Sequence, residues 1–157
     1  QDITSDKAAA ASSSINDLMD EKFTDENRES VNEKISKMVD DYNSMVKNAT
    51  NSDSSSIKQK ATWMTNLVSQ YSDVLKTAGI SINSDKTLSI DKDSLNKADM
   101  TSLKNTFGSN ANSFANKVLY KSEQIYSLAK TYGSSATAYT SNGTYSRDYS
   151  SNYESMT

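Results

Sequence analysis

The chain has 157 residues, a formal net charge of −3 and a hydrophobic share of 34%, and it contains neither Cys nor His. This length suits a single domain, and the low hydrophobic share predicts a thin core of the kind that long helices form along a narrow seam. Without Cys and His, disulfides, thiolate nucleophiles, imidazole bases and the usual zinc sites are excluded. The acidic balance argues against a nucleic-acid partner, and no apolar stretch is long enough to span a membrane.

Two helices are predicted first. An Ala- and Ser-rich helix covers residues 6–22, although the run from Ala8 to Ser14 is equally typical of a frayed lead-in. The second helix begins at Thr24 or Asp25, where a capping side chain and acidic residues favour a helix start. Its apolar residues recur at spacings of four and three: Val31, Ile35, Met38, Tyr42 and Met45. This period predicts a long amphipathic helix close to coiled-coil geometry.

A third helix over residues 57–78 repeats the same rhythm and ends at Gly79, a residue typical of the position after a helix. Trp63, Leu67 and Val74 widen its apolar stripe, and we expect Trp63 to be a core or bundle-edge residue rather than a platform for a ligand. Because a short polar loop joins the second and third helices, they are predicted to pair antiparallel.

The next stretch predicts a β-hairpin at about residues 80–90. "ISI" and "TLSI" alternate apolar and polar residues on either side of the turn-forming "NSDK". Two strands alone are marginal in water, so their apolar face must lie on the helices. We therefore expect the hairpin to cap one end of the bundle.

After the hairpin, the apolar spacing predicts a short helix or two ending at Gly108, and then a last long helix ending near Gly133. Ser122 interrupts the apolar stripe of that helix, which suggests local exposure or a looser seam. The predicted fold is all-α with one small β-hairpin. It is an antiparallel bundle of three to four long amphipathic helices, contained in residues 1–133.

The last segment, residues 134–157, is rich in Tyr and Ser and is predicted to be a flexible or partner-ordered tail. Asn142-Gly143 is a signal for a two-residue hairpin turn, but that turn places Tyr139 and Tyr145 on opposite faces and forms no apolar face. Tyrosines supply contact area at low entropic cost, so four of them are candidate partner contacts. These are Tyr139, Tyr145, Tyr149 and Tyr153.

No stretch of the chain predicts a catalytic, cofactor or metal site. The Asp-rich run that starts at Asn83 resembles a calcium loop, but Leu88 stands where that loop needs Gly and Ser94 where it needs Glu. Asp40 and Asp41 are adjacent on a helix and point about 100° apart, which is typical of a solvated edge rather than an acid–base pair. A nucleophile elbow and a Gly-rich phosphate loop are also missing, so we expect no enzyme.

Three stretches, taken in order, resemble the flagellar filament-cap family, also known as the second hook-associated protein. "ISKMVDDYNSMVKNAT" carries a Val-x-x-Tyr-Asn pattern, and "VLKTAGISINSDKTLSIDKDSLNKA" and a short helix ending in Phe follow it. The matching positions are Val39, Tyr42, Asn43, Gly79, Ile80, Leu88, Asp91, Leu95 and Phe107. The resemblance covers roughly Ile35 to Tyr132 and corresponds to the helical C-terminal region of the family, shortened and diverged. Lys86 replaces the Gly that the family usually has in the hairpin turn.

This resemblance implies an extracellular structural protein of the bacterial flagellum, exported through the flagellar secretion apparatus. Its partners would be flagellin or other axial subunits, together with copies of itself in a ring, and its matched residues would be structural. Two alternatives stay open: a secreted or cell-surface helical binding module without a flagellar role, and a cytosolic chaperone for an exported partner. Because the chain begins at Gln1 rather than Met, we expect that an upstream segment has been removed or left out.

Overall fold

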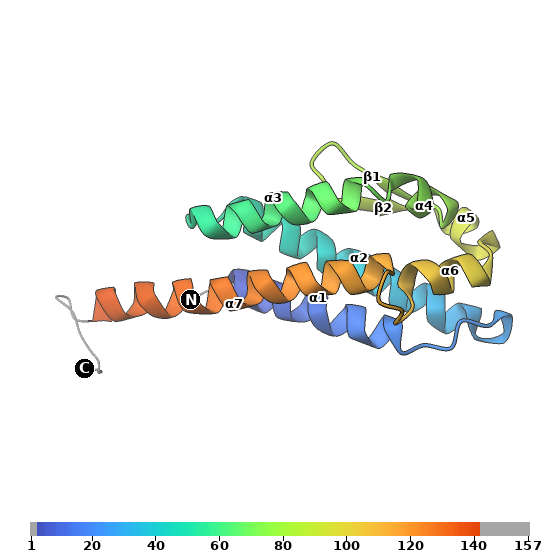
Figure 1. Ribbon diagram of the computed structural model, residues 1–157, viewed down its shortest axis with the longest axis horizontal. Coiled ribbons are helices and arrows are strands. Elements are labelled where there is room, and N and C mark those ends of the chain that lie inside the picture. The colour runs from blue at the N-terminus through green and yellow to red at the C-terminus, as the bar shows by residue number, and fades with distance from the viewer. Residues whose placement is uncertain (1–2, 142–157) are drawn as a thin grey trace.

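A bundle of four long helices forms the body of the protein (Figure 1). The computed structural model describes residues 3–141, with side-chain surroundings through residue 132. The long helices are α1 (Ile3–Met19), α2 (Arg28–Thr50), α3 (Ser55–Ser69) and α7 (Phe114–Ser141). They run alternately up and down, with α1 between α2 and α7, and α3 packed on α7 and α2. The predicted mostly-α fold with one small hairpin is confirmed.

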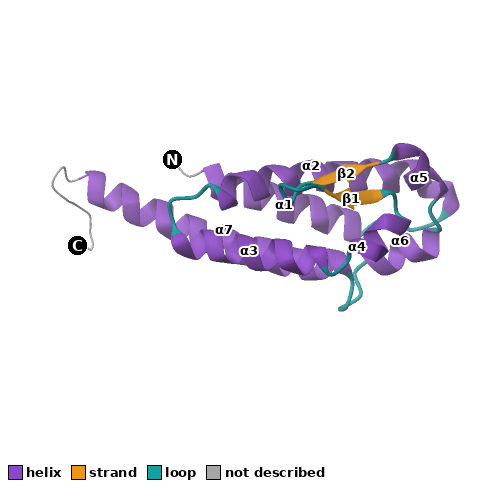
Figure 2. Cartoon of the chain, turned by 90° about the horizontal axis from the view of Figure 1, so that it is seen from above, coloured by secondary structure: helices purple, strands orange, loops and turns teal. Residues whose placement is uncertain are grey.

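The half of the bundle that α3 does not reach is completed by five short elements (Figure 2). They are α4 (Ser72–Thr77), β1 (Ile80–Ile82), β2 (Leu88–Ile90), α5 (Lys92–Lys97) and α6 (Met100–Phe107). Asp91 and Asp99 start α5 and α6 by accepting hydrogen bonds from the backbone N–H groups of Ser94 and Ser102. The residues between the hairpin and Gly108 therefore form two helices, one of the two arrangements that the sequence predicts.

The hairpin lies along the side of α2, whereas the sequence predicts a cap on the bundle end. Its antiparallel strands pair Ile80 with Ile90 and Ile82 with Leu88. Ile80 and Leu88 are buried, and β2 contacts α2 directly. The physical reason is that α3 ends at Ser69 and leaves the apolar side of α2 to be covered by the next segment of chain.

The predicted third helix is divided in two at Gln70 and Tyr71. Tyr71 has φ −103° and ψ 16°, outside helical geometry, and α4 begins after it. Its ring packs edge-on against Phe114, with 5.3 Å between ring centroids. Val68 and Leu75, on either side of the break, are both buried, so the break keeps one apolar stripe directed at the core. The break coincides with the packing of Tyr71 on Phe114 of α7. The spacing of apolar residues within one helix cannot reveal such a contact with a distant helix.

Two helix boundaries also differ from the prediction. Thr24 makes no capping hydrogen bond with its side chain, and a short 3-10 turn (Asp25–Asn27) precedes α2. Helix α7 continues through Gly133 to Ser141, so it crosses the predicted boundary of the tail. A glycine inside a helix costs about 1 kcal/mol but does not by itself end the helix. The C-terminal end of α7 extends past the other helices (Figure 1).

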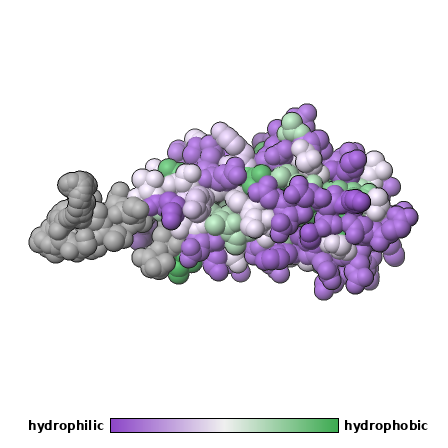
Figure 3. All heavy atoms as spheres, turned by 90° about the horizontal axis from the view of Figure 1, so that it is seen from below, coloured by the Kyte–Doolittle hydropathy of each residue, from purple (hydrophilic) through white to green (hydrophobic). Residues whose placement is uncertain are grey.

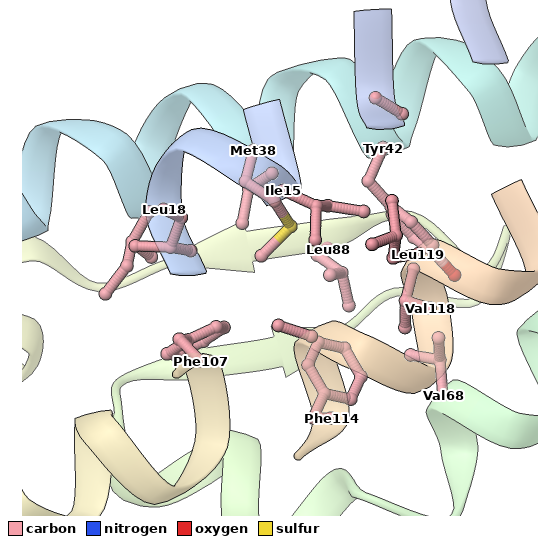
Figure 4. Packing of buried hydrophobic residues seen from close by; sticks show 14 of the residues in the cluster. Ile15, Leu18, Met38, Tyr42, Val68, Leu88, Phe107, Phe114, Val118 and Leu119 are labelled. Carbon is pink, nitrogen blue, oxygen red and sulfur yellow. The ribbon is translucent and has the colours of Figure 1, made fainter. Parts of the chain in front are cut away.

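The core collects side chains from nearly every element (Figure 4). Figure 4 labels Ile15, Leu18, Met38, Tyr42, Val68, Leu88, Phe107, Phe114, Val118 and Leu119 in this cluster. Ala8 and Ala11 are fully buried where α1 is held between α2 and α7, because small side chains let helices approach closely. Ser122 is also fully buried and lies 2.7 Å from the hydroxyl of Ser12. The interruption in the α7 stripe is therefore a polar pair within the seam, not an exposed position.

Candidate functional site

Asn43 of α2 binds the backbone of strand β2 with both ends of its amide. Its Nδ2 donates to the carbonyl of Leu88 at 2.9 Å, and the N–H of Leu88 donates to its Oδ1 at 2.8 Å. The side chain therefore satisfies both backbone groups of Leu88, as a neighbouring strand would. We call this arrangement the hairpin clamp; it consists of Asn43 and the Leu88 peptide groups.

Most residues of the family resemblance belong to the hydrophobic core. Six of them are buried: Val39, Tyr42, Ile80, Leu88, Leu95 and Phe107. Gly79 has φ 80°, and a Cβ there would lie 2.8 Å from the carbonyl oxygen of Asp91. Asp91 itself caps α5. These positions thus belong to the core or to the glycine turn and helix cap beside it.

Tyr42 is fully buried, and its hydroxyl has no hydrogen-bond partner among the described residues. Burial raises the pKa of this phenol well above its ordinary value of 10.0, because the anion cannot be solvated there. The hydroxyl therefore stays protonated at neutral pH and represents an uncompensated cost of burial.

The Asp-rich hairpin turn is held by its own side chains. Asp85 accepts hydrogen bonds from the backbone N–H of Thr87 at 3.0 Å and from its hydroxyl at 2.5 Å, and these bonds lower the pKa of Asp85. Asn83 donates to the Thr87 hydroxyl at 2.9 Å. Lys86 takes a left-handed conformation with φ 73°, at the turn position where the family that the chain resembles usually has Gly. In the part of the chain that the structure describes, no group of three or more Asp and Glu side chains is arranged to hold a metal ion.

The two adjacent aspartates of α2 face different surroundings. Asp41 accepts hydrogen bonds from the hydroxyl of Ser14 on α1 and from the amine of Lys37, the latter at 3.0 Å. Asp40 is exposed. Asp41 therefore joins α2 to α1, so the predicted solvated edge holds for Asp40 but not for Asp41, whose carboxylate is mostly covered by these contacts.

An open groove of about 750 Å³ runs between α2 and α5. Arg28, at one end, donates to the carbonyls of Leu95 and Ala98 at 3.2 and 2.6 Å and so satisfies the C-terminus of α5. The Lys37 amine in the same groove is paired with Asp41. Charges of both signs line this groove, and several of them already have structural partners.

Four large aromatic side chains are exposed on α3 and α7: Trp63, Tyr120, Tyr126 and Tyr132. Trp63 of α3 is 44% exposed, and Tyr120 of α7 is 60% exposed. The face shown in Figure 3 is mostly hydrophilic, with small groups of hydrophobic side chains. Trp63 lies at the edge of the bundle, one of the two positions that the sequence predicts for it. Tyr120 is not among the site residues that the sequence predicts. Its position outside the apolar stripe of Phe114 and Val118 does indicate an exposed aromatic side chain.

Lysines surround these rings. The Lys60 amine lies 4.1 Å from the centroid of the Trp63 ring, and the Lys121 amine lies 5.6 Å from it and 5.8 Å from the Tyr120 ring. Shallow grooves of about 440 and 370 Å³ lie beside Tyr120 and include Leu67 and Leu128 in their walls. We call this surface of α3 and α7 the aromatic–lysine face, comprising Lys60, Trp63, Leu67, Lys117, Tyr120, Lys121 and Leu128.

Of the four tyrosines predicted as partner contacts, one belongs to the residues that the structure describes and three do not. The backbone of Tyr139 belongs to α7. Tyr145, Tyr149 and Tyr153 lie outside the described residues. Their role as contacts stays a prediction.

Comparison of the chain with family models, with curated proteins and with solved structures finds no match to any of them. The site itself is therefore the basis for a functional proposal. Across residues 3–141, none of the helices has both the length and the apolar character needed to cross a bilayer.

Proposed function

We propose that this chain is a non-enzymatic structural and assembly protein that acts through contacts with other protein subunits. Its resemblance to the flagellar filament-cap family makes flagellin or another axial subunit the first partner to test. The expected location is outside the cell, on the bacterial flagellum or cell surface.

One observation carries this proposal: two of the three stretches of the resemblance are joined directly at the hairpin clamp. Asn43 comes from the first stretch, and Leu88, which it binds, comes from the second. Phe107, from the third, is buried in the same core. If the three stretches resembled the family only by chance, they would not need to contact one another in the structure. Their convergence supports a shared structural module, and the function of the family is the natural hypothesis for it.

Binding of the protein to flagellin from its own source, followed by biolayer interferometry at physiological salt, tests this function. We expect saturable binding in the micromolar range or tighter, that is, a binding free energy of about −8 kcal/mol or better. A second variant that lacks residues 134–157 measures how much the tail contributes. Absence of binding to flagellin that is competent for polymerisation would reject the flagellar role and favour a secreted or cell-surface binding module.

A further inference from the structure

We propose that the aromatic–lysine face is the docking site for an acidic amphipathic helix of a partner protein. This inference rests on the proposed function and assigns the partner contact to a surface. Trp63 and Tyr120 provide the apolar anchors, and Lys60, Lys117 and Lys121 provide the charges that select the partner.

The charge of the face is the first support. In the described side chains, ion pairs join Arg28 to Asp25, Lys34 to Glu21 and Lys37 to Asp41, so all three lie around α1 and α2. Lys60, Lys117 and Lys121 take part in none of them. Lys60 and Lys121 lie near the same Trp63 ring and Lys117 lines the same groove as Lys121, so three cations gather at one place, with Glu123 lining the adjoining groove. A partner carboxylate would complement this positive surface.

The aromatic rings hold the lysine amines in position. Two ammonium groups lie within 6 Å of the Trp63 ring centroid, at 4.1 and 5.6 Å, a distance at which a cation is attracted to an aromatic face. A carboxylate beside them would make charge-assisted hydrogen bonds with amines that are already partly ordered. The anchor and the charge selection therefore occur in one cluster.

The shape of the face favours a helix as the occupant. Its residues lie along two packed antiparallel helices, from Lys117 to Leu128 on α7 and from Lys60 to Leu67 on α3. At a rise of about 1.5 Å per residue, the α7 segment is about 16 Å long, or three helical turns. Apolar residues between flanking lysines match a partner helix with a Leu-like stripe bordered by Glu or Asp.

Trp63 is the only tryptophan of the chain, so its fluorescence reports directly on this face. The probe is an acetylated, Trp-free helical peptide of Glu, Ala and Leu with its Leu residues on one side. We expect a saturable shift of the Trp63 emission to shorter wavelength, which weakens as salt is added. A peptide with every Glu replaced by Lys is the charge control, and equal binding of that peptide would overturn the proposal.

A double variant, Lys60→Glu with Lys121→Glu, should bind the acidic peptide at least about tenfold more weakly. The matched control, Lys104→Glu with Lys130→Glu, makes the same change in net charge away from the face and should bind like the wild type. Circular dichroism confirms that both variants fold. Equal affinity of the two double variants would contradict the proposal.

Two other occupants are distinguished in the same assay. A Trp63 shift with phosphatidylglycerol vesicles but not with the peptide would assign the face to a membrane surface and reject the proposal. A shift that grows with protein concentration alone, together with a dimer in sedimentation, would assign it to a second copy and also reject it. Flagellin that binds both double variants equally would reject the docking face while leaving the proposed function standing. Binding of the peptide without binding of flagellin would support the docking face and reject the proposed function.

Discussion

At the scale of single residues, the most informative position is Tyr42, where the family resemblance and the physics of burial meet. A fully buried hydroxyl without a partner destabilises the folded state by its lost hydration. Its neighbour in sequence, Asn43, satisfies both ends of its amide at the hairpin clamp. Adjacent polar groups of the same helix therefore have opposite effects on stability.

Tyr42→Phe should raise the free energy of unfolding by up to about 1 kcal/mol, because it removes the unpaired hydroxyl and keeps the ring in the core. Urea denaturation at neutral pH measures this change. Tyr120→Phe is the control, since its exposed ring lies outside the core and its hydroxyl is accessible to water. A clear loss of stability in Tyr42→Phe would mean that the hydroxyl has a partner after all.

The raised pKa of Tyr42 also predicts a dependence on alkaline pH. Below the unfolded pKa of 10.0, Tyr42 is protonated in both the folded and the unfolded chain, and the stability that depends on its protonation is fully present. Above that value only the unfolded chain releases the proton, so the free energy of unfolding falls as pH rises. We expect the free energy of unfolding to fall by about 1.4 kcal/mol per pH unit more steeply in the wild type than in Tyr42→Phe. Denaturation curves of both proteins, collected at matched pH values around and above the unfolded pKa, provide the comparison. Parallel curves would contradict it.

At the scale of elements, the hairpin depends on α2. The two strands have three residues each, and a hairpin of that size is not stable alone in water. Burial of Ile80 and Leu88 supplies the apolar contacts, and the hairpin clamp fixes the position of β2 along α2. Gly79 brings the chain into β1 at a place where a side chain would collide with α5.

Asn43→Ala should lower the free energy of unfolding by about 2–3 kcal/mol, because it leaves the N–H and C=O of Leu88 without their partners. Amide exchange at Leu88 should accelerate more than exchange in α1. Asn48→Ala is the matched control on the same helix: among the described residues its amide donates to the local carbonyl of Ser44, so a loss below about 1 kcal/mol is expected there. Equal losses in the two variants would exclude a special role for the clamp.

At the scale of the whole molecule, α1 is the helix on which the bundle closes, because it lies between α2 and α7. Its seam contains Ala8 and Ala11 and the polar pair of Ser12 with Ser122. The Ala- and Ser-rich composition that also suited a frayed lead-in is therefore the composition of a tightly packed helix.

The run of alanines in α1 offers a direct test of this packing. Ala11→Leu should destabilise the protein by about 1–3 kcal/mol, because the added methyl groups have no space between α2 and α7. Ala10→Leu places the same side chain on the exposed side of the helix and should change stability by no more than about 0.5 kcal/mol. Thermal unfolding of both variants measures the difference. Similar melting temperatures would mean that α1 does not dock as described.

Local chemistry in the sequence determined the kinds of element. Apolar spacings of four and three specified the helices, alternation around "NSDK" specified the hairpin, and Gly79 ended a helix as expected. These features succeed because helix periodicity, turn formation and glycine conformation depend on residues a few positions apart.

Only the tertiary structure decided where the elements meet. The break at Tyr71 accompanies packing on Phe114, Ser122 pairs with Ser12, and Asn43 clamps Leu88. The aromatic–lysine face likewise exists only because α3 lies against α7. Each of these features joins residues far apart in the chain, and periodicity reports which side of a helix is apolar but not which distant partner covers it.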